Sequence, residues 1–394
     1  MLLVPTDLIQ PGMVLAQPVH HPARDDLVLL HAQYELDAQM SRELQQQGVQ
    51  YVWIEVPGLE EVGESVSPFV ARGHTDLLRV LDRSINTLEH RIEVKVNVEH
   101  YQHAVHEMLT RIVQEPSHQV VTQHLSACAP MLAGHLANCS YLALLIGAHL
   151  SGYLISQRPA VPPSLADNTT QLGLGALLHD IGKVYMPDDL QSVSVLDSES
   201  EWPEYRFHVQ TGYEEVREHV SPVAANIVLH HHERFDGKGF PGRQRNDRSE
   251  PLGGTDIHVF SRIVAVVDAF DHLLCPSGKA VPTVQAIHSL RQRRFSGWFD
   301  PVVVEALLRL VPPFMVGSVV TLEDGSDAAV VTNHPEAPCK PTVRLLGAPL
   351  AAGAREATGR QIDLRMSRGN QIAVVDGHDV RNFLYDGEFE SRAA

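Results

Sequence analysis

The stretch 169–187, TTQLGLGALLHDIGKVYMP, joins an apolar run to the pair His179 and Asp180. Leu, Ala and Gly fill the run, which predicts a helix that is buried on several sides. An Ile-Gly pair then lets the chain turn, so that the side chain of Lys183 can reach back. Imidazole and carboxylate are ligands of divalent metals, so the segment predicts a metal site in a helical fold. A His-Asp pair that only caps a helix is the alternative.

A second segment, VLHHHERFDGKGFPG at 228–242, carries three consecutive histidines. His231 and His232 stand near the end of a predicted helix, and the Gly-rich loop after them lets backbone approach a ligand. Three neighbouring side chains on one helix cannot all face one cleft, so we interpret His230 as a bystander. An exposed histidine run without a ligand is the alternative interpretation.

A third segment, SRIVAVVDAFDHLL at 261–274, places Asp268 inside an apolar run. A buried carboxylate is costly unless it is paired or coordinated, which makes Asp268 a functional candidate. Asp271, one turn later, is the alternative inward carboxylate, and Arg262 is a candidate ion-pair partner for either. His135 and His208 are weaker candidates, because a lone histidine on an apolar helix is more often a hydrogen-bonded core residue.

Together these segments offer more donors than one tetrahedral ion can use. Two metal ions about 3.5–4 Å apart are a common device for cleaving phosphate diesters by in-line attack. The sequence therefore predicts a metal-dependent phosphodiesterase. Its candidate metal ligands are His135, His179, Asp180, His208, His231, His232 and Asp268.

The composition is that of a soluble globular protein, with 44% hydrophobic and 20% charged residues among 394. Lys and Arg number 31 against 48 Asp and Glu, a net charge of −17, which argues against a partner of duplex nucleic acid. A small anionic ligand stays compatible, because metals reverse the local field. Four cysteines without a CxxC pair indicate free thiols. No signal peptide or membrane span is recognisable, so we expect a cytoplasmic protein.

The chain divides into four predicted parts. Residues 1–57 have an α+β texture, with strands in VLAQPV, LVLLHA and VQYVWIEV and a helix that ends at Gly48. Residues 58–118 are predicted as a linker with connecting helices. Residues 119–312 are helical, with loops at 156–168, 187–204 and 236–256 and a long apolar helix from Pro130 to Leu154 that carries His135. Residues 313–394 form short β-hairpins, the first turning at Asp324-Gly325.

The motifs LLHDIGK, His208 ahead of Gly212, HHERFDGKGFPG and RIVAVVDAFD stand in the order found in the HD-GYP family. That family is a branch of the HD-domain phosphohydrolases that hydrolyse cyclic di-GMP. The resemblance covers residues 119–312, and it implies an HD-type helical bundle. Residues 1–57 resemble a small N-terminal domain of unknown function that often precedes the HD-GYP domain. The final hairpins are similar to the β extension that follows some of these domains.

The resemblance implies a role for each matching residue. It implies that two, sometimes three, iron or manganese ions are bound by the seven candidate ligands above. Asp180 would be the bridging ligand, and Lys183 would contact the scissile phosphate, so these two are the catalytic candidates. The residues expected to bind substrate are Lys183, Arg234, Asp236, Gly237, Gly239, Phe240, Pro241, Arg262 and Lys279.

The sequence departs from the family at three places. The Gly-Tyr-Pro motif reads Gly239-Phe240-Pro241, and Met131 replaces the glutamate of three-metal members, so two divalent ions are expected. HLLCPSGKA replaces an Arg-Pro-Tyr-Arg-like stretch and leaves Lys279 as its cation.

Three hypotheses follow from this pattern. The first is a phosphodiesterase that converts cyclic di-GMP to linear pGpG or GMP. The second is a degenerate domain that senses nucleotide, or holds a signalling protein partner, without turnover. The third keeps the chemistry and changes the substrate to another cyclic dinucleotide or to a nucleoside phosphate. The sequence leaves open whether the chain forms a homodimer.

Overall fold

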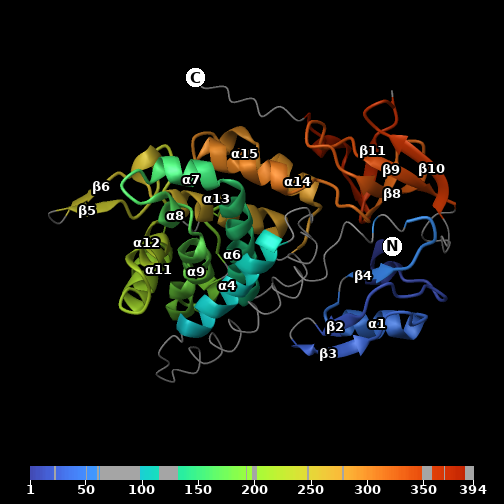
Figure 1. Cartoon of the computed structure of the whole chain (residues 1–394), viewed down its shortest axis with the longest axis horizontal. Helices are drawn as coiled ribbons and strands as arrows, with labels where there is room; N and C mark the ends of the chain where they lie inside the picture. The colour runs from blue at the N-terminus through green and yellow to red at the C-terminus, as the bar shows by residue number, and fades with distance from the viewer. Residues whose placement is uncertain are drawn as a thin grey trace.

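The computed structural model describes residues 1–21, 24–49, 51–59, 62, 98–114, 132–191, 193–197, 202–245, 248–276, 279–347, 357–367 and 369–386. In Figure 1 a bundle of helices fills the left side of the molecule, and strands from the two ends of the chain lie on the right. Most of the predicted linker and connecting helices at 58–118 lies outside the described residues, as does Met131.

The helical bundle has one apolar core. Its longer helices are α4 (Val98–Gln114), α6 (Leu132–His149), α9 (Thr170–Leu178), α11 (Pro203–Val216), α12 (Pro222–His230), α13 (Val259–Leu274), α14 (Thr283–Leu290) and α15 (Pro301–Leu310). Shorter pieces join them: α7 (Ser151–Gln157), α8 (Pro163–Ala166), η2 (Ile181–Tyr185) and α10 (Asp188–Gln191). This confirms the predicted mainly α fold. The predicted loop at 236–256 contains a small hairpin, β5 (Arg243–Arg245) with β6 (Arg248–Glu250).

Helix α6 lies in the middle of the bundle, because its own residues are apolar or small on every side of the helix. Its buried residues run from Ala133 to Gly147 with one partly exposed position, Leu145. The predicted single helix to Leu154 is wrong, because the chain bends by 85° between α6 and α7. Leu150 leaves the helical backbone there, and Ser151 and Gly152 follow as weak helix formers.

Local sequence sets where two helices of the bundle, α12 and α15, begin. Ser221 caps α12 by accepting a hydrogen bond from the backbone of Ala224, and Pro222 occupies the first helical position. Asp300 caps α15 in the same way, through the backbone N–H of Val302. Both starts are written in the sequence as a polar residue followed by proline. They fix the direction in which each helix enters the bundle.

The N-terminal part is a small α+β unit. Strand β1 (Leu2–Pro5) pairs antiparallel with β4 (Tyr51–Ile54), and β2 (Val19–His21) pairs with β3 (Arg24–Leu30). Helix α1 (Ala38–Gln46) is capped by Asp37, and Gly48 follows it at a φ of 80°. That positive φ confirms the predicted helix end.

The C-terminal part is a six-stranded antiparallel sheet in the order β10-β9-β8-β7-β11-β12. Its strands are β7 (Val319–Leu322), β8 (Asp327–Thr332), β9 (Thr342–Leu346), β10 (Ala357–Asp363), β11 (Ile372–Val375) and β12 (His378–Asp379). Strands β7 and β8 form the predicted hairpin, with Gly325 at a φ of 85° in its turn.

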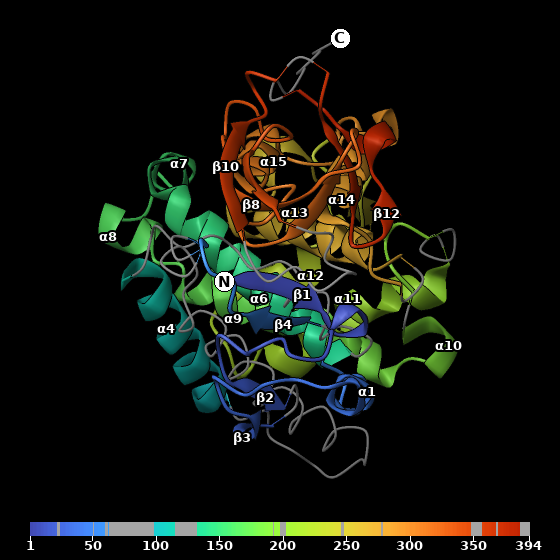
Figure 2. The same ribbon diagram turned by 90° about the vertical axis from the view of Figure 1, so that its right-hand side faces the viewer.

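The two terminal units share a hydrophobic core. Met315, Val316 and Val331 of the C-terminal part pack with residues of β1 and β4, and the backbone N–H of Leu3 donates to the carbonyl of Gly317. Figure 2 shows β1 and β4 running below the C-terminal sheet. The N-terminal unit is thus attached to the C-terminal sheet, although the whole helical bundle separates them in sequence.

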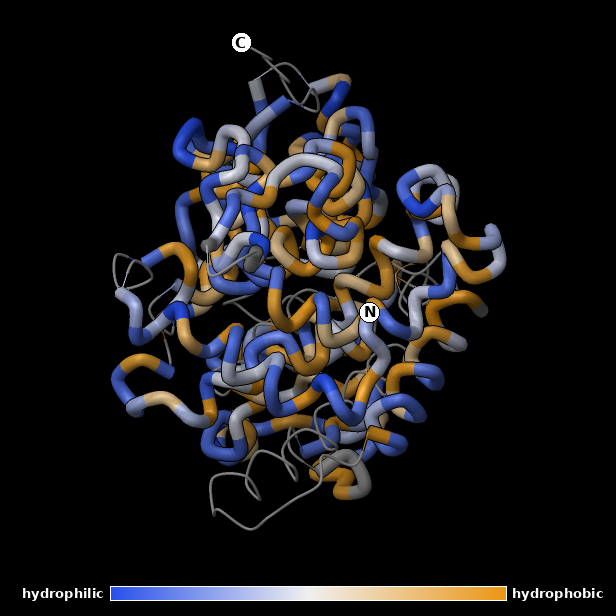
Figure 3. The backbone as a smooth tube through the Cα atoms, turned by 90° about the vertical axis from the view of Figure 1, so that its left-hand side faces the viewer, coloured by the Kyte–Doolittle hydropathy of each residue, from blue (hydrophilic) through white to orange (hydrophobic). Residues whose placement is uncertain are grey.

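Several helices at the surface of the bundle are amphipathic. Along its outer helices the tube in Figure 3 alternates between hydrophilic and hydrophobic residues, which is the pattern of helices that bury one face. In the described part of the chain, no single helix has the length and apolar composition to cross a membrane.

Candidate metal centre

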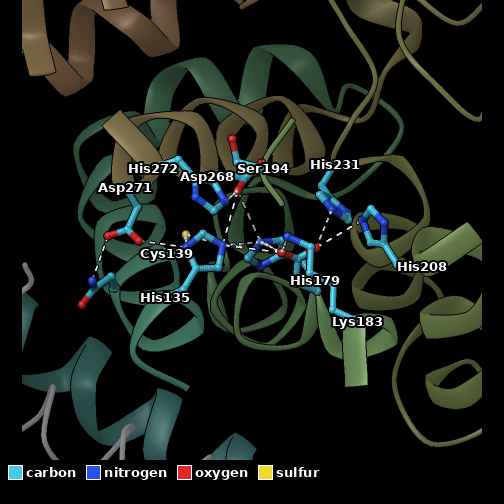
Figure 4. A network of polar contacts seen from close by, with 12 residues as sticks. His135, Cys139, His179, Lys183, Ser194, His208, His231, Asp268, Asp271 and His272 are labelled. Carbon is cyan, nitrogen blue, oxygen red and sulfur yellow. Dashed lines mark hydrogen bonds and ion pairs between the residues drawn. The ribbon is translucent and has the colours of Figure 1, made fainter. Parts of the chain in front are cut away.

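Two groups of metal-ligating atoms lie in the middle of the bundle and share Asp180. The first group contains His135, Asp180, Asp268 and His272, and the second group contains Asp180, His208, His231 and His232. Within each group the ligand atoms lie within 4.8 Å of one another. His179 adds a further nitrogen beside His135. Figure 4 shows side chains converging from α6, the end of α9, α11, the end of α12 and α13, namely His135, His179, His208, His231, Asp268 and His272. The seven predicted ligands therefore meet in one place.

The turn after α9 brings Asp180 to α11. A Cβ on Gly182 would stand 2.0 Å from the carbonyl oxygen of His208, so only glycine lets η2 pack this closely on α11. The same approach leaves Nε2 of His208 at 3.2 Å from Oδ1 of Asp180. Gly182 thus sets the distance between the two helices as well as allowing the chain to turn.

The first group surrounds Nε2 of His135. That atom lies 3.2 Å from Nε2 of His179 and 3.3 Å from Oδ1 of Asp268. Oδ2 of Asp180 lies 3.7 Å from Nε2 of both histidines. Four ligand atoms from three separate helices and the turn after α9 therefore face one small volume.

The second group lies on the other oxygen of Asp180. Oδ1 of that carboxylate is 3.2 Å from Nε2 of His208 and 3.4 Å from Nε2 of His231. Nε2 of His232 lies 3.1 Å from Nε2 of His208. Each oxygen of Asp180 thus belongs to a different group, which is the position of a bridging ligand.

Backbone and carboxylate acceptors orient the imidazole rings. Nδ1 of His135 donates to Asp271, and Nδ1 of His179 donates to the carbonyl of Ala176. Nδ1 of His231 likewise donates to the carbonyl of Val228. A ring that carries its proton on Nδ1 has its lone pair on Nε2, so these rings present lone pairs to the centre.

Burial keeps the second group in its metal-binding protonation state. Burial lowers the pKa of His231 to about 4, and burial together with His231 lowers the pKa of His232 well below its usual value. Burial alone would raise the pKa of Asp180, but Lys183 and the surrounding imidazoles outweigh it and hold that pKa well below its usual value. Neutral imidazole and ionised carboxylate are the forms that bind metal.

The donor set fits divalent cations. Both carboxylate oxygens of Asp268 and Nε2 of His231 are buried, with no hydrogen-bond partner among the described residues. Nε2 of His135 and Nε2 of His179 lie 3.2 Å apart, a close approach that a cation between the two nitrogens would stabilise. Positive charge placed among these atoms would satisfy all of them.

Lys183 is buried at the edge of the centre. Its ammonium lies 2.6 Å from Oδ2 of Asp180 and donates to the carbonyl of Val193. The side chain is 2% exposed, so the predicted reach back to the His-Asp pair is present in the structure.

The loop after α12 brings Phe240 to the second group. The centroids of the Phe240 and His232 rings lie 4.9 Å apart, and the guanidinium of Arg206 lies 4.9 Å from the centroid of Phe240. Gly239 allows this, because a Cβ there would stand 2.3 Å from the backbone nitrogen of Arg234. Pro241 follows through a cis peptide bond.

Other predicted substrate contacts have partners of their own. Arg234 pairs with Asp236 at 2.6 Å and lies 4.0 Å from the centre of the Trp298 ring. Gly237 is the next turn residue, with a φ of 75°. Lys279 is exposed, and no contact between it and the centre is observed among the described residues.

Arg262 is engaged by protein groups, and its predicted role in substrate binding stays a prediction. Its guanidinium is buried and bonds to Asp300, to Gln157 and to the hydroxyl of Tyr153, while Nε donates to the carbonyl of Ile257. Arg262 precedes Asp268 by six residues on α13, which turns it to another face of the helix. It holds α13 to α7 and α15 through these bonds.

The sequence interpretation missed His272 and Tyr205 at the centre, and it named Asp271 only as the alternative to Asp268. Asp271 accepts from Nδ1 of His135 and from the amide of Asn138. Nε2 of His272 approaches Asp268, and the hydroxyl of Tyr205 lies 3.3 Å from Nε2 of His232. A usable signal existed, because residues three and four after Asp268 lie on the same helical face as Asp268. In the same way, the residue three before His208 lies on the helical face of His208.

Comparison with known proteins agrees with this geometry. Residues 155–303 match the family described as HD domain, and residues 319–381 match the KOW domain associated with HD domain. The latter match covers most of the C-terminal sheet that the sequence predicted as a β extension.

Three individual proteins are similar to parts of this chain. Cyclic di-GMP phosphodiesterase PA4108 of Pseudomonas aeruginosa is 32% identical over 44% of this chain and 41% of its own length. The 3'3'-cGAMP-specific phosphodiesterase 2 of Vibrio cholerae is 34% identical over 41% of this chain and 31% of its own length. The solved structure of Bd1817, an HDG"Y"P protein from Bdellovibrio bacteriovorus, is 17% identical with a TM-score of 0.43, and the match covers 77% of this chain and 97% of that one.

The chain therefore spans less than half the length of either curated relative. Within that span the ordered motifs, the ligand-bearing helices and the match over residues 155–303 agree. The chain therefore contains an HD domain within residues 155–303.

Proposed function

We propose that this chain is a two-metal phosphodiesterase that hydrolyses cyclic di-GMP to linear pGpG, to GMP or to both. The observation that carries the proposal is the shared carboxylate: Oδ1 of Asp180 faces His208 and His231, and Oδ2 faces His135 and His179. Two divalent ions, iron or manganese, would supply an activated water and neutralise charge on the phosphate.

The chain's own residues would position these partners. His135, His179 and Asp268 would hold one ion, His208, His231 and His232 would hold the other, and Asp180 would contribute to both. The buried ammonium of Lys183 fixes Asp180 and adds positive charge beside the centre, where a phosphate oxygen would bind. The Phe240 ring, next to His232, offers an apolar surface to a nucleotide.

One observation favours the second hypothesis, a nucleotide-sensing scaffold. Two predicted substrate cations, Arg234 and Arg262, are already paired with aspartates, and Arg262 is buried as well. A domain with this arrangement would keep its metal ligands and have fewer cationic side chains with which to bind substrate. The division of the chain at residues 57, 118 and 312 stays our proposal for its domains.

The test uses the full chain purified without oxygen. Metal content is measured first, and then cyclic di-GMP and 3'3'-cGAMP are each incubated with the Mn²⁺- or Fe²⁺-loaded protein, with products separated by chromatography. We expect about two ions per chain and hydrolysis of cyclic di-GMP.

The control is Asp180→Ala, which removes the shared ligand and should lose metal and hydrolysis together. Metal without hydrolysis of either dinucleotide would favour the scaffold. Faster hydrolysis of 3'3'-cGAMP would assign another substrate to the same centre. Protein without metal would overturn the proposal.

A further inference from the structure

His272 lies at the metal centre although the sequence interpretation did not include it. Its Nε2 atom is 3.3 Å from Oδ1 of Asp268, and its ring centroid is 4.5 Å from that of His135. It belongs with His135, Asp180 and Asp268 to one group of atoms within 4.8 Å of each other. Figure 4 shows the ring entering this group from α13, on the side away from His208 and His231.

The helix explains this position. Asp268 and His272 are four residues apart on α13, so their side chains lie one above the other on the face turned towards α6. The intervening Asp271 is engaged elsewhere, with His135 and Asn138. His272 is therefore held beside the carboxylate by the geometry of the helix itself.

The inward nitrogen of this ring makes no hydrogen bond to any residue that the structure describes. This atom, Nε2 of His272, is buried. Both carboxylate oxygens of the neighbouring Asp268 are also buried without a hydrogen-bond partner among the described residues. A buried polar atom without a partner is costly, and two such groups 3.3 Å apart indicate a common missing cation.

We propose that Nε2 of His272 is a further ligand of the ion held by His135, His179, Asp180 and Asp268. This proposal rests on the two-metal centre of the proposed function. It gives this ion three imidazoles where the sequence motifs provide two. Imidazole suits iron better than manganese, so His272 biases this position towards iron. It also removes one coordination position that water or substrate could occupy on this ion.

The experiment compares metal binding by four full-length proteins: wild type, His272→Leu, His272→Asn and His288→Leu. Leu keeps the apolar volume of the ring, and Asn serves if Leu disturbs the fold, which circular dichroism reports. His288 is the matched control, because it is a half-buried histidine on α14 that packs against Phe383. Each metal-free protein is titrated with Fe²⁺ and with Mn²⁺ by calorimetry under nitrogen.

We expect wild type and His288→Leu to bind two ions. Both His272 variants should bind one ion at least about tenfold more weakly, with the larger loss for Fe²⁺, and the other ion as in wild type. Pulsed electron paramagnetic resonance of bound Mn²⁺ should show one fewer coupled imidazole nitrogen.

Variants with wild-type affinities and nitrogen couplings would overturn the role of His272 and leave the two-metal centre standing. Weaker binding with an unchanged number of coupled nitrogens would also overturn it, since His272 would then only position Asp268. Wild type that binds no ion would overturn both proposals.

Discussion

Oδ2 of Asp271 accepts a 2.8 Å hydrogen bond from Nδ1 of His135, on a helix far away in sequence. The bond fixes the proton on Nδ1 and aims Nε2 at Asp180 and Asp268. Carboxylates behind a histidine ligand orient the ring and raise its basicity.

Asp271→Ala should therefore weaken binding of one ion about 10–100-fold while the chain stays folded. Asp271→Asn keeps an acceptor oxygen and should cause a smaller loss. Titration of the metal-free variants measures both. Equal affinities in wild type and Asp271→Ala would refute the role of this carboxylate.

Lys183→Met should lower hydrolysis about 100-fold while both ions stay bound, because it removes a positive charge beside the reacting phosphate and leaves every ligand atom in place. Turnover and metal content are measured on the same sample. Lys340→Met, a partly exposed lysine of the C-terminal part, is the control. A matched loss of metal would show that Lys183 supports Asp180 and not the phosphate.

Phe240→Tyr restores the hydroxyl that the family carries. The ring stands beside His232 and is partly exposed, so a hydroxyl at its edge can reach a bound nucleotide. One such hydrogen bond is worth about 1 kcal/mol, and KM should fall about fivefold. Steady-state kinetics test this. Unchanged kinetics would mean that only the ring matters.

His258 should make the metal-free protein sensitive to mild acid. Burial, followed by Arg158 and Arg262, lowers the pKa of His258 to about 4. Between pH 6.5 and 4 the unfolded chain binds this proton and the folded chain does not. The free energy of unfolding therefore falls as pH falls through this range, by up to about 1.4 kcal/mol per pH unit.

His258→Asn should flatten this dependence. Asn keeps a side chain that can cap α13, where the His258 ring accepts from the backbone of Phe260. Urea unfolding of both proteins with a chelator present, at several pH values, measures the difference. Parallel curves would rule out His258 as the source.

The sequence predicted the centre better than its surroundings. Asp268 stood out because a carboxylate inside an apolar run needs a partner, and the structure places it among the ligands. The same reasoning was not carried on to His272, although a residue four positions after Asp268 lies on the same helical face. Arg262 was considered as a partner of Asp268 or Asp271, and its observed partner, Asp300, is brought to it only by the packing of α15.

The fold shows the same division between local and distant information. Gly48 and the Asp324-Gly325 turn were predicted correctly, because a positive φ is a property of a few residues. The bend between α6 and α7 was not, since the apolar pattern continues through it. Helix type depends on local spacing, whereas the direction of a helix after a break depends on what it packs against.

The bond between Leu3 and Gly317 has a consequence for biosynthesis. At about 5–20 residues per second, a ribosome releases Gly317 roughly 15–60 s after Leu3. During that time the apolar strand β1 lacks the residues of the C-terminal part that complete its core. It is then exposed to aggregation or to binding by a chaperone. Nascent chains stalled before and after residue 331 should therefore differ sharply in the protease resistance of their first fifty residues.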